Sequence, residues 1–137
     1  MIKEHYDAVK ALLPATMRVH MWSVPSAPVY PYVVLWGDLG DESSGGPDGD
    51  SLRDVPDVLT LRMRATYVGV NGDSMLITAR NARASLSRKT PTVAGWRPNP
   101  LRQSVLLDGQ VDTDVTFTGG GNPVFAVDEF LLISHKL

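Results

Sequence analysis

The chain of 137 residues contains no cysteine, which excludes a disulfide framework and a thiolate metal site. No apolar run approaches the roughly 20 residues of a membrane-spanning helix, so we expect no membrane partner. The segment from Met1 to Asp7 lacks the basic and then apolar layout of a secretory signal. We therefore expect a protein that stays in the cell that makes it, or in a particle assembled there.

Histidine is scarce, which limits the catalytic chemistry that the sequence predicts. The histidines are His5, His20 and His135, near opposite ends of the chain, and none stands beside a serine in a strained glycine-rich turn. Nucleophilic catalysis requires a serine, threonine or cysteine with an oriented base, and the sequence contains no such motif. For His20, no second histidine or cysteine lies nearby in the sequence to complete a metal site.

The best acidic cluster combines two segments of the last third of the chain: Asp112, Asp114, Asp128 and Glu129. Adjacent strands could bring these carboxylates together to hold Mg²⁺ for phosphodiester hydrolysis. However, Asp112 and Asp114 occupy the polar face of an alternating segment, where carboxylates are expected in any case. We therefore expect no enzyme, no metal and no cofactor, and we keep a metal-dependent phosphodiesterase as a remote alternative.

What is present fits a single globular domain over residues 1–137. Apolar residues make up 43% and charged residues 20% of the chain, which are ordinary values for a soluble domain. The clearest stretch is 56–86. Within it, residues 57–68 alternate with a period of two, which predicts a half-buried strand whose core face comprises Leu59, Leu61, Met63, Ala65 and Tyr67.

A tight turn and a helix follow this strand. Asn71-Gly72 is a strong turn dipeptide, and Asp73 or Ser74 is placed to cap the helix that begins there. The helix is predicted to end near Ser87. Its apolar stripe comprises Met75, Ala79, Ala82 and Leu86, flanked by Leu76, Ile77 and Ala84.

The remaining segments predict an α+β fold. An amphipathic helix over residues 3–13 ends at Pro14, and short strands over 18–22 and 32–36 flank a proline-rich connection. The last third predicts a short strand at 104–107, a turn at Asp108-Gly109, an alternating strand at 111–117 and a long closing strand at 124–134. We expect a single, mostly antiparallel β-sheet with two helices packed on one side.

Charge is unevenly distributed, although the net charge is only −2. Residues 38–57 hold seven acids and one base, whereas residues 74–107 hold six bases and no acid. Solvated faces would explain this distribution, and so would complementary surfaces on neighbouring copies. The Gly/Ser-rich segment 38–56 cannot bury apolar surface, so it is predicted to be a flexible loop, and its candidate contact residues are Asp41, Glu42, Asp48, Asp50 and Arg53.

Several cations and one tryptophan are further candidates for contacts with a partner. Arg62 and Arg64 share the polar face of the strand at 57–68, where they could meet water, a neighbouring subunit's carboxylates or a phosphate backbone. Water and an acidic subunit surface are the preferred interpretations, because the chain as a whole is acidic. The other candidates are Arg80 and Arg83 on the outer side of the predicted helix, Trp96 at the edge of the core, and Arg97 beside it.

Five segments carry a resemblance to a known family: AVKALL at 8–13, VYPYVVL at 29–35, LRMRATY at 61–67, SMLITARNARASL at 74–86 and PVFAVDEFLLI at 123–133. With the order of the elements, they cover nearly the whole chain. In this pattern the chain resembles the tail-terminator, or tail-completion, proteins of siphophage-type long-tailed bacteriophages. The resemblance rests on the succession of elements and on approximate similarity of the residues in these segments. The family has no catalytic motif to transfer.

The resemblance implies an α+β subunit that closes into a homo-oligomeric ring, a hexamer, at the head-proximal end of the tail tube. Such a ring stops polymerisation of the tail tube protein and presents a surface to head-completion, or connector, proteins. DNA would at most pass through its lumen. The implied location is the virion tail, and the host cytoplasm during assembly.

Other functions remain open, one of them in the same broad class of phage structural proteins. Another head–tail connector or neck protein of a phage would share the size, the α+β content and the loop-borne contacts. A nucleic-acid-binding module, like the phosphodiesterase, is a remote alternative.

Overall fold

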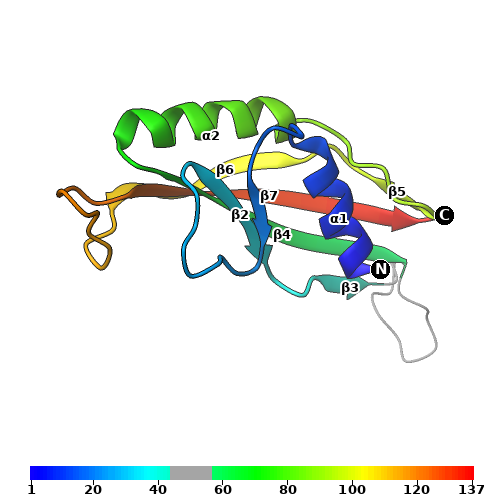
Figure 1. The fold of residues 1–137 in the computed structure, drawn as a ribbon. Coiled ribbons are helices and arrows are strands. Elements are labelled where there is room, and N and C mark those ends of the chain that lie inside the picture. The colour runs from blue at the N-terminus through cyan, green and yellow to red at the C-terminus, as the bar shows by residue number, and fades with distance from the viewer. Residues whose placement is uncertain (44–56) are drawn as a thin grey trace.

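The computed structural model of the protein describes residues 1–43 and 57–137 (Figure 1). It contains two helices and one curled, mostly antiparallel seven-stranded sheet, which confirms the α+β class. In chain order the elements are α1 (Ile2–Leu12), β1 (Val19–Met21), β2 (Tyr32–Gly37), β3 (Asp41–Ser43), β4 (Val58–Gly69), α2 (Gly72–Leu86), β5 (Trp96–Pro98), β6 (Arg102–Val111) and β7 (Val124–Lys136).

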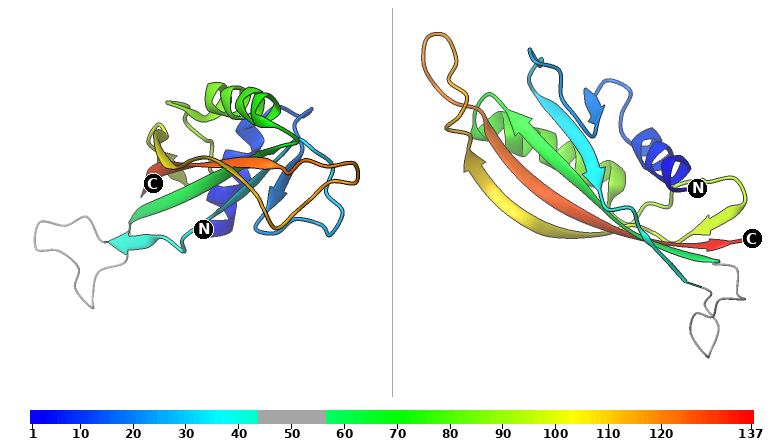
Figure 2. Two further views of the ribbon diagram at one scale, coloured as in Figure 1. Left: turned by 90° about the vertical axis from the view of Figure 1, so that its left-hand side faces the viewer. Right: turned by 90° about the horizontal axis from the view of Figure 1, so that it is seen from below.

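The sheet is built around the long antiparallel pair β4 and β7, which run side by side in both views of Figure 2. Their register extends from Val58 opposite His135 to Gly69 opposite Val124. The outer side of β4 pairs with β2 and, further along, with β3, while the outer side of β7 pairs with β6 and β5. Strand β1 joins β2 in the one parallel pairing of the described sheet. One edge of the sheet therefore consists of β1 and β3, and the other of β6 and β5.

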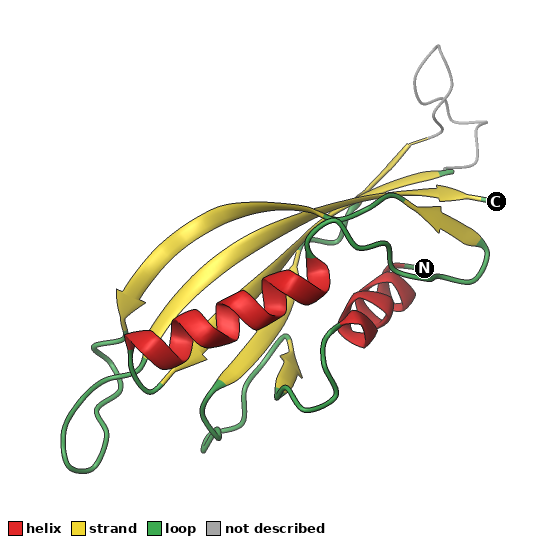
Figure 3. Ribbon diagram, turned by 90° about the horizontal axis from the view of Figure 1, so that it is seen from above, coloured by secondary structure: helices red, strands yellow, loops and turns green. Residues whose placement is uncertain are grey.

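The core lies between one face of the sheet and both helices, as expected. The predicted core face of β4 is buried throughout, with each of its five side chains at most 1% exposed. Tyr6 and Val9 of α1 and Ala82 and Leu86 of α2 join the same cluster. Figure 3 looks onto this side of the molecule, where the two helices lie over the sheet. The opposite side of the sheet is called the open face below, because no described helix covers it.

Helix α2 differs in two respects from the prediction. Its N-cap is Asn71, whose side-chain oxygen accepts a hydrogen bond from the Ser74 amide at 2.8 Å, so neither Asp73 nor Ser74 is the cap. Asn71 is both the first residue of the turn dipeptide and the helix cap. Its extended backbone lets its side chain accept a hydrogen bond from the first turn of the helix. Leu76 and Ile77 are 61% and 57% exposed, so the buried stripe is narrower than predicted.

The strand predicted at 104–107 lies within β6, but the turn predicted at Asp108-Gly109 and the strand predicted at 111–117 are wrong. A single strand, β6, runs through Asp108 and Gly109, and the chain from Asp112 to Pro123 contains no strand. Strand β6 pairs with the long strand β7 on both sides of this dipeptide. Two register shifts in β6, between Val105 and Leu107 and between Leu107 and Gln110, form β-bulges, so the chain does not reverse at Asp108-Gly109.

The acidic segment predicted as one loop over 38–56 contains a strand. Asp41, Glu42 and Ser43 form β3, which pairs with Thr60, Leu59 and Val58 of β4. Residues 44–56 of the predicted loop, including Asp48, Asp50 and Arg53, lie outside the described residues.

Candidate interaction surfaces

Arg64 lies on the open face of the sheet, as the alternation of β4 predicts. Its Nε atom is 3.3 Å from Oε2 of Glu129, which stands opposite it on β7. On its other side, the guanidinium carbon lies 5.1 Å from the ring centroid of Trp36 on β2. Arg64 is thus held between a carboxylate and an aromatic ring of its own chain, contacts that favour a fixed orientation.

Arg62, two residues earlier on the same face, has looser contacts. Its Nε atom is 4.0 Å from Oε1 of Glu129, and its Nη1 atom is 3.8 Å from Oδ2 of Asp41 on β3. The side chains of Arg62 and Asp41 are 46% and 84% exposed, so this pair contributes at most about 1 kcal/mol. The structure therefore adds an alternative that the sequence did not suggest, because the acids facing these arginines belong to the same chain. Arg62 remains accessible to a further partner.

Asp128 points to the opposite side of the sheet and is almost fully buried, at 1% exposure. It accepts hydrogen bonds from Arg83 through Nε at 2.5 Å and Nη2 at 2.7 Å, from Tyr67 Oη at 2.8 Å and from Gln103 Nε2 at 3.2 Å. The hydrogen bond to Asp128 raises the pKa of Arg83, and burial, followed by the charge of Asp128, raises the pKa of Tyr67. This cluster joins α2, β4, β6 and β7.

Arg83 therefore does not share the outer side of α2 with Arg80, which corrects the prediction. It turns toward the sheet to neutralise a buried carboxylate, while Arg80 is exposed. A signal for this pair was present in the sequence. Asp128 falls in phase with Phe130 and Leu132 on the core face of β7, where an acid requires a partner.

The acidic cluster considered for Mg²⁺ does not come together. Asp128 and Glu129 lie on opposite faces of β7, and Asp112 and Asp114 lie in the connection after β6. Among residues 1–43 and 57–137, no three histidines, aspartates or glutamates are grouped as they would be around a metal ion.

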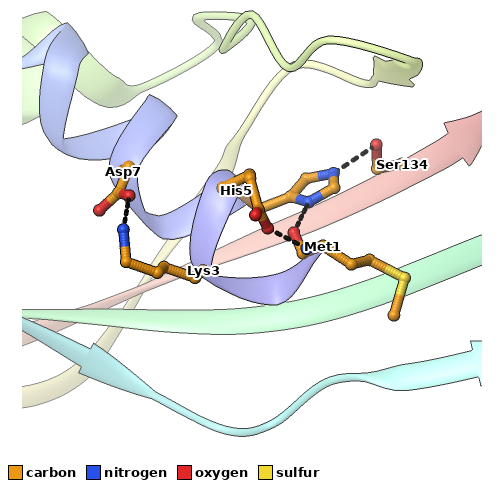
Figure 4. A network of polar contacts seen from close by, with 6 residues as sticks. Met1, Lys3, His5, Asp7 and Ser134 are labelled. Atoms are coloured by element: carbon orange, nitrogen blue, oxygen red, sulfur yellow. Dashed lines mark hydrogen bonds and ion pairs between the residues drawn. The ribbon is translucent and has the colours of Figure 1, made fainter.

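His5 and Ser134 are in contact, although no motif in the sequence associates them (Figure 4). The Nε2 atom of His5 is 2.8 Å from Ser134 Oγ, and its Nδ1 atom is 2.6 Å from the carbonyl oxygen of Met1. Because a carbonyl can only accept, Nδ1 carries the proton and Nε2 accepts from the serine hydroxyl. Burial lowers the pKa of His5, which favours this neutral form.

A serine bonded to a histidine also resembles the nucleophile and base of hydrolases. Here both side chains are 0% exposed, and the ring of Trp96 packs edge-on against His5 with centroids 5.1 Å apart. A substrate cannot reach Ser134 Oγ in this arrangement. The contact instead ties α1 to β7 and β5.

The remaining predicted residues lie at the C-terminal end of β7. Trp96 packs against the core, as expected for a cap at its edge, and Arg97 beside it is exposed. Arg97 stands opposite His135 in the pairing of β5 with β7. Asp41 and Glu42 are exposed on β3 at the same end of the sheet, which brings acidic and basic candidates to one region of the molecule.

One further surface was missed from the sequence. Trp22 follows β1 with a φ of 71°, a left-handed conformation that is uncommon for a bulky residue, and its side chain is 52% exposed. It borders a hollow of about 340 Å³ on the open face, whose aromatic lining also includes Tyr32, Trp36 and Phe125. Neither alternation nor spacing indicates that the connection at 22–31 turns this tryptophan outward.

No helix in the described residues has the length and apolar character needed to cross a membrane. Comparisons of the sequence with known protein families and with curated proteins find no match. A function therefore has to be argued from the surfaces described above.

Proposed function

We propose that the protein is a structural component of a phage virion, a tail terminator that forms a hexameric ring on the head-proximal end of the tail tube. The ring ends polymerisation of the tail tube protein and offers its other side to a head-completion or connector protein. In this proposal the protein acts by binding and needs no cofactor. It resides in the virion tail after assembly in the host cytoplasm.

The observation that carries the proposal is the asymmetry of the sheet. Its two edges consist of different strands, β1 and β3 on one side and β6 and β5 on the other, and no described strand covers either edge. A closed ring with more than two copies requires a head-to-tail contact between two unlike surfaces of the same chain. The two edges supply such surfaces, and the rest of the proposal depends on the resemblance of the sequence to tail terminators.

Another head–tail connector or neck protein is the alternative, since it would use the same kind of surface. The nucleic-acid-binding and phosphodiesterase alternatives receive less support. The carboxylates that would hold Mg²⁺ are divided between two faces of the sheet and a connection. The net charge of −2 also disfavours a phosphate backbone as the main partner.

The proposal is tested by measuring the mass of the native protein and imaging it in negative stain over a range of concentrations. We expect a ring of six subunits with a central hole, either alone or when polymerised tail tubes are added. On tubes, the ring should lie at one end and stop further growth. Failure to bind tube ends would exclude the terminator, and salt-dependent DNA binding or Mg²⁺-dependent phosphodiester cleavage by the pure protein would favour the remote alternatives.

A further inference from the structure

We propose that neighbouring copies meet through side chains of opposite charge, with Asp41 and Glu42 on β3 of one copy facing Arg97 and Arg102 on the β5–β6 edge of the next. This inference rests on the proposed ring and identifies its subunit contact. The first pair is called the acidic edge and the second pair the basic edge.

The two edges lie at the same level of the sheet. Near the C-terminal end of β7, the sheet is a band of four strands in the order β3, β4, β7 and β5. Across this band, Ser43 pairs with Val58, Val58 with His135, and His135 with Arg97. In the same way Glu42 is in line with Pro98, through Leu59 and Ser134. Figure 1 shows β3 and β5 at this end of the molecule.

This alignment lets a second copy bring its acidic edge against the basic edge of the first without a shift along the strands. Asp41 is two residues from the level of Arg97, an offset of about 7 Å that a long arginine side chain can span.

Three of the four charged groups share a face, whereas Glu42 stands opposite Leu59 and belongs to the other face of β3. Asp41 stands opposite Thr60, Arg97 opposite His135, and Arg102 opposite Leu131. These partners belong to the open face, since Thr60 pairs with Ile133 and Arg62 pairs with Leu131 in the register of β4 with β7. Asp41 of one copy would therefore meet Arg97 and Arg102 of the next on one continuous face.

The backbone of β5 has no free donor with which to extend the sheet into a neighbour, so at β5 the contact must come from side chains. The amide of Asn99 donates to the carbonyl of Ile133, which by alternation directs the nitrogens of residues 98 and 100 outward. Both are prolines and have no N–H group. The amide of Trp96 donates to the carbonyl of Val93 at 3.1 Å. The outward positions from 96 to 100 thus have no free donor for a new strand.

The side chains themselves are available. Asp41, Glu42, Arg97 and Arg102 are all exposed, and no carboxylate in residues 1–43 or 57–137 forms an ion pair with Arg97 or Arg102. Complementary charge at the rim of a contact steers association and sets the register of the two surfaces. An acidic protein surface is therefore the partner that the basic edge fits best, and the acidic edge of a second copy provides it.

The test uses charge reversal at each edge in the full-length protein. Asp41→Lys with Glu42→Lys changes the acidic edge, and Arg97→Glu with Arg102→Glu changes the basic edge. Each variant alone should need at least about tenfold more protein to form rings, because like charges then face one another. An equal mixture of the two variants should form rings in which the variants alternate, because one contact then joins the two unaltered edges and the next joins the two reversed edges. The variant carrying all four changes should form rings again.

Lys10→Glu and Asp114→Lys are matched controls, as both residues are exposed and lie away from the two edges. They should form rings as the unaltered chain does, and circular dichroism should show that every variant is folded. If the edge variants assemble like the controls, or if the mixture behaves like its components, the proposed contact is wrong while the ring stands. If the unaltered chain forms no ring even with tail tubes, the proposed function fails instead.

Discussion

Two adjacent acids on β7 have different roles because alternation places them on opposite faces. Asp128 is buried and bonded to Arg83, Tyr67 and Gln103, whereas Glu129 lies on the open face beside Arg64. The cost of removing a charge depends on whether its partner can return to water. Burial makes Asp128 the more important residue for stability, although both acids form ion pairs with an arginine.

Asp128→Asn should lower the free energy of unfolding by about 2 to 4 kcal/mol, because it leaves Arg83 without its buried counter-charge. The estimate is reduced for the partial exposure of Arg83, whose side chain is 42% accessible. Glu129→Gln is the matched control and should cost less than about 1 kcal/mol. Urea unfolding followed by circular dichroism measures both, and equal losses would contradict the proposed difference.

His5 predicts a dependence of stability on pH. Burial lowers its pKa from the ordinary value of 6.5, so the unfolded chain binds a proton more readily than the folded one. The stability that neutral His5 provides is complete above pH 6.5 and declines as the pH falls below that value toward the folded pKa. Thermal melts between about pH 8 and pH 5 should show this decline.

His5→Gln isolates this contribution from the other titrating groups. The variant should be less stable at neutral pH, because the contact with Ser134 is changed, but its melting temperature should vary less between about pH 6.5 and pH 5. An unchanged slope in this range would show that groups other than His5 determine the acid response.

At the scale of elements, the corner between β4 and α2 determines how the helix covers the sheet. Gly69 ends β4 so close to the helix that an added Cβ would lie 2.4 Å from the Met75 amide nitrogen. Because this neighbour is backbone, it cannot move aside as a side chain would. Gly72 lies only three residues later, yet a Cβ there would meet nothing within 4 Å.

Gly69→Ala should therefore reduce stability by about 1 to 3 kcal/mol or more, through displacement of the first turn of α2. Gly72→Ala should be neutral or stabilising by up to about 1 kcal/mol, because alanine favours the helix. Chemical unfolding of the two variants gives the comparison. Similar destabilisation by both would mean that the corner tolerates less change than its geometry indicates.

At the scale of the whole molecule, the proposed ring depends on charges at two edges of one sheet. Screening lengths fall from about 10 Å at 0.1 M salt to about 3 Å at 1 M, so exposed pairs weaken as salt is added. We expect the concentration needed for half-maximal ring formation to rise with NaCl. Sedimentation velocity at several salt concentrations measures this shift.

Asp41→Asn with Glu42→Gln provides the comparison, since it removes the charges of the acidic edge without reversing them. Rings of this variant should be weaker at low salt and much less sensitive to NaCl than those of the unaltered chain. If salt strengthens the rings of both proteins, apolar burial must dominate the contact, and the exposed tryptophan Trp22 becomes the first residue to substitute.

The strands and helices with strong periodicity follow from the sequence alone. The buried face of β4 and the proline-terminated helix α1 were predicted because each repeats apolar residues with one period over many positions. The closing strand β7 was predicted as a long strand too. Local chemistry also identified the turn at Asn71-Gly72, although not which residue caps α2. The charge asymmetry between residues 38–57 and 74–107 is likewise a property of the sequence.

Only the tertiary structure decided which distant residues meet. Strand β6 runs through the Asp108-Gly109 turn signal because it pairs with the long strand β7. A prediction from neighbouring residues alone takes no account of that pairing. The contacts of Asp128 with Arg83 and of His5 with Ser134 join residues 45 and 129 positions apart. The alignment of β3 with β5 across β4 and β7 arises in the same way. Periodicity specifies which face of an element is buried, whereas the register between elements specifies which charges stand at the same level.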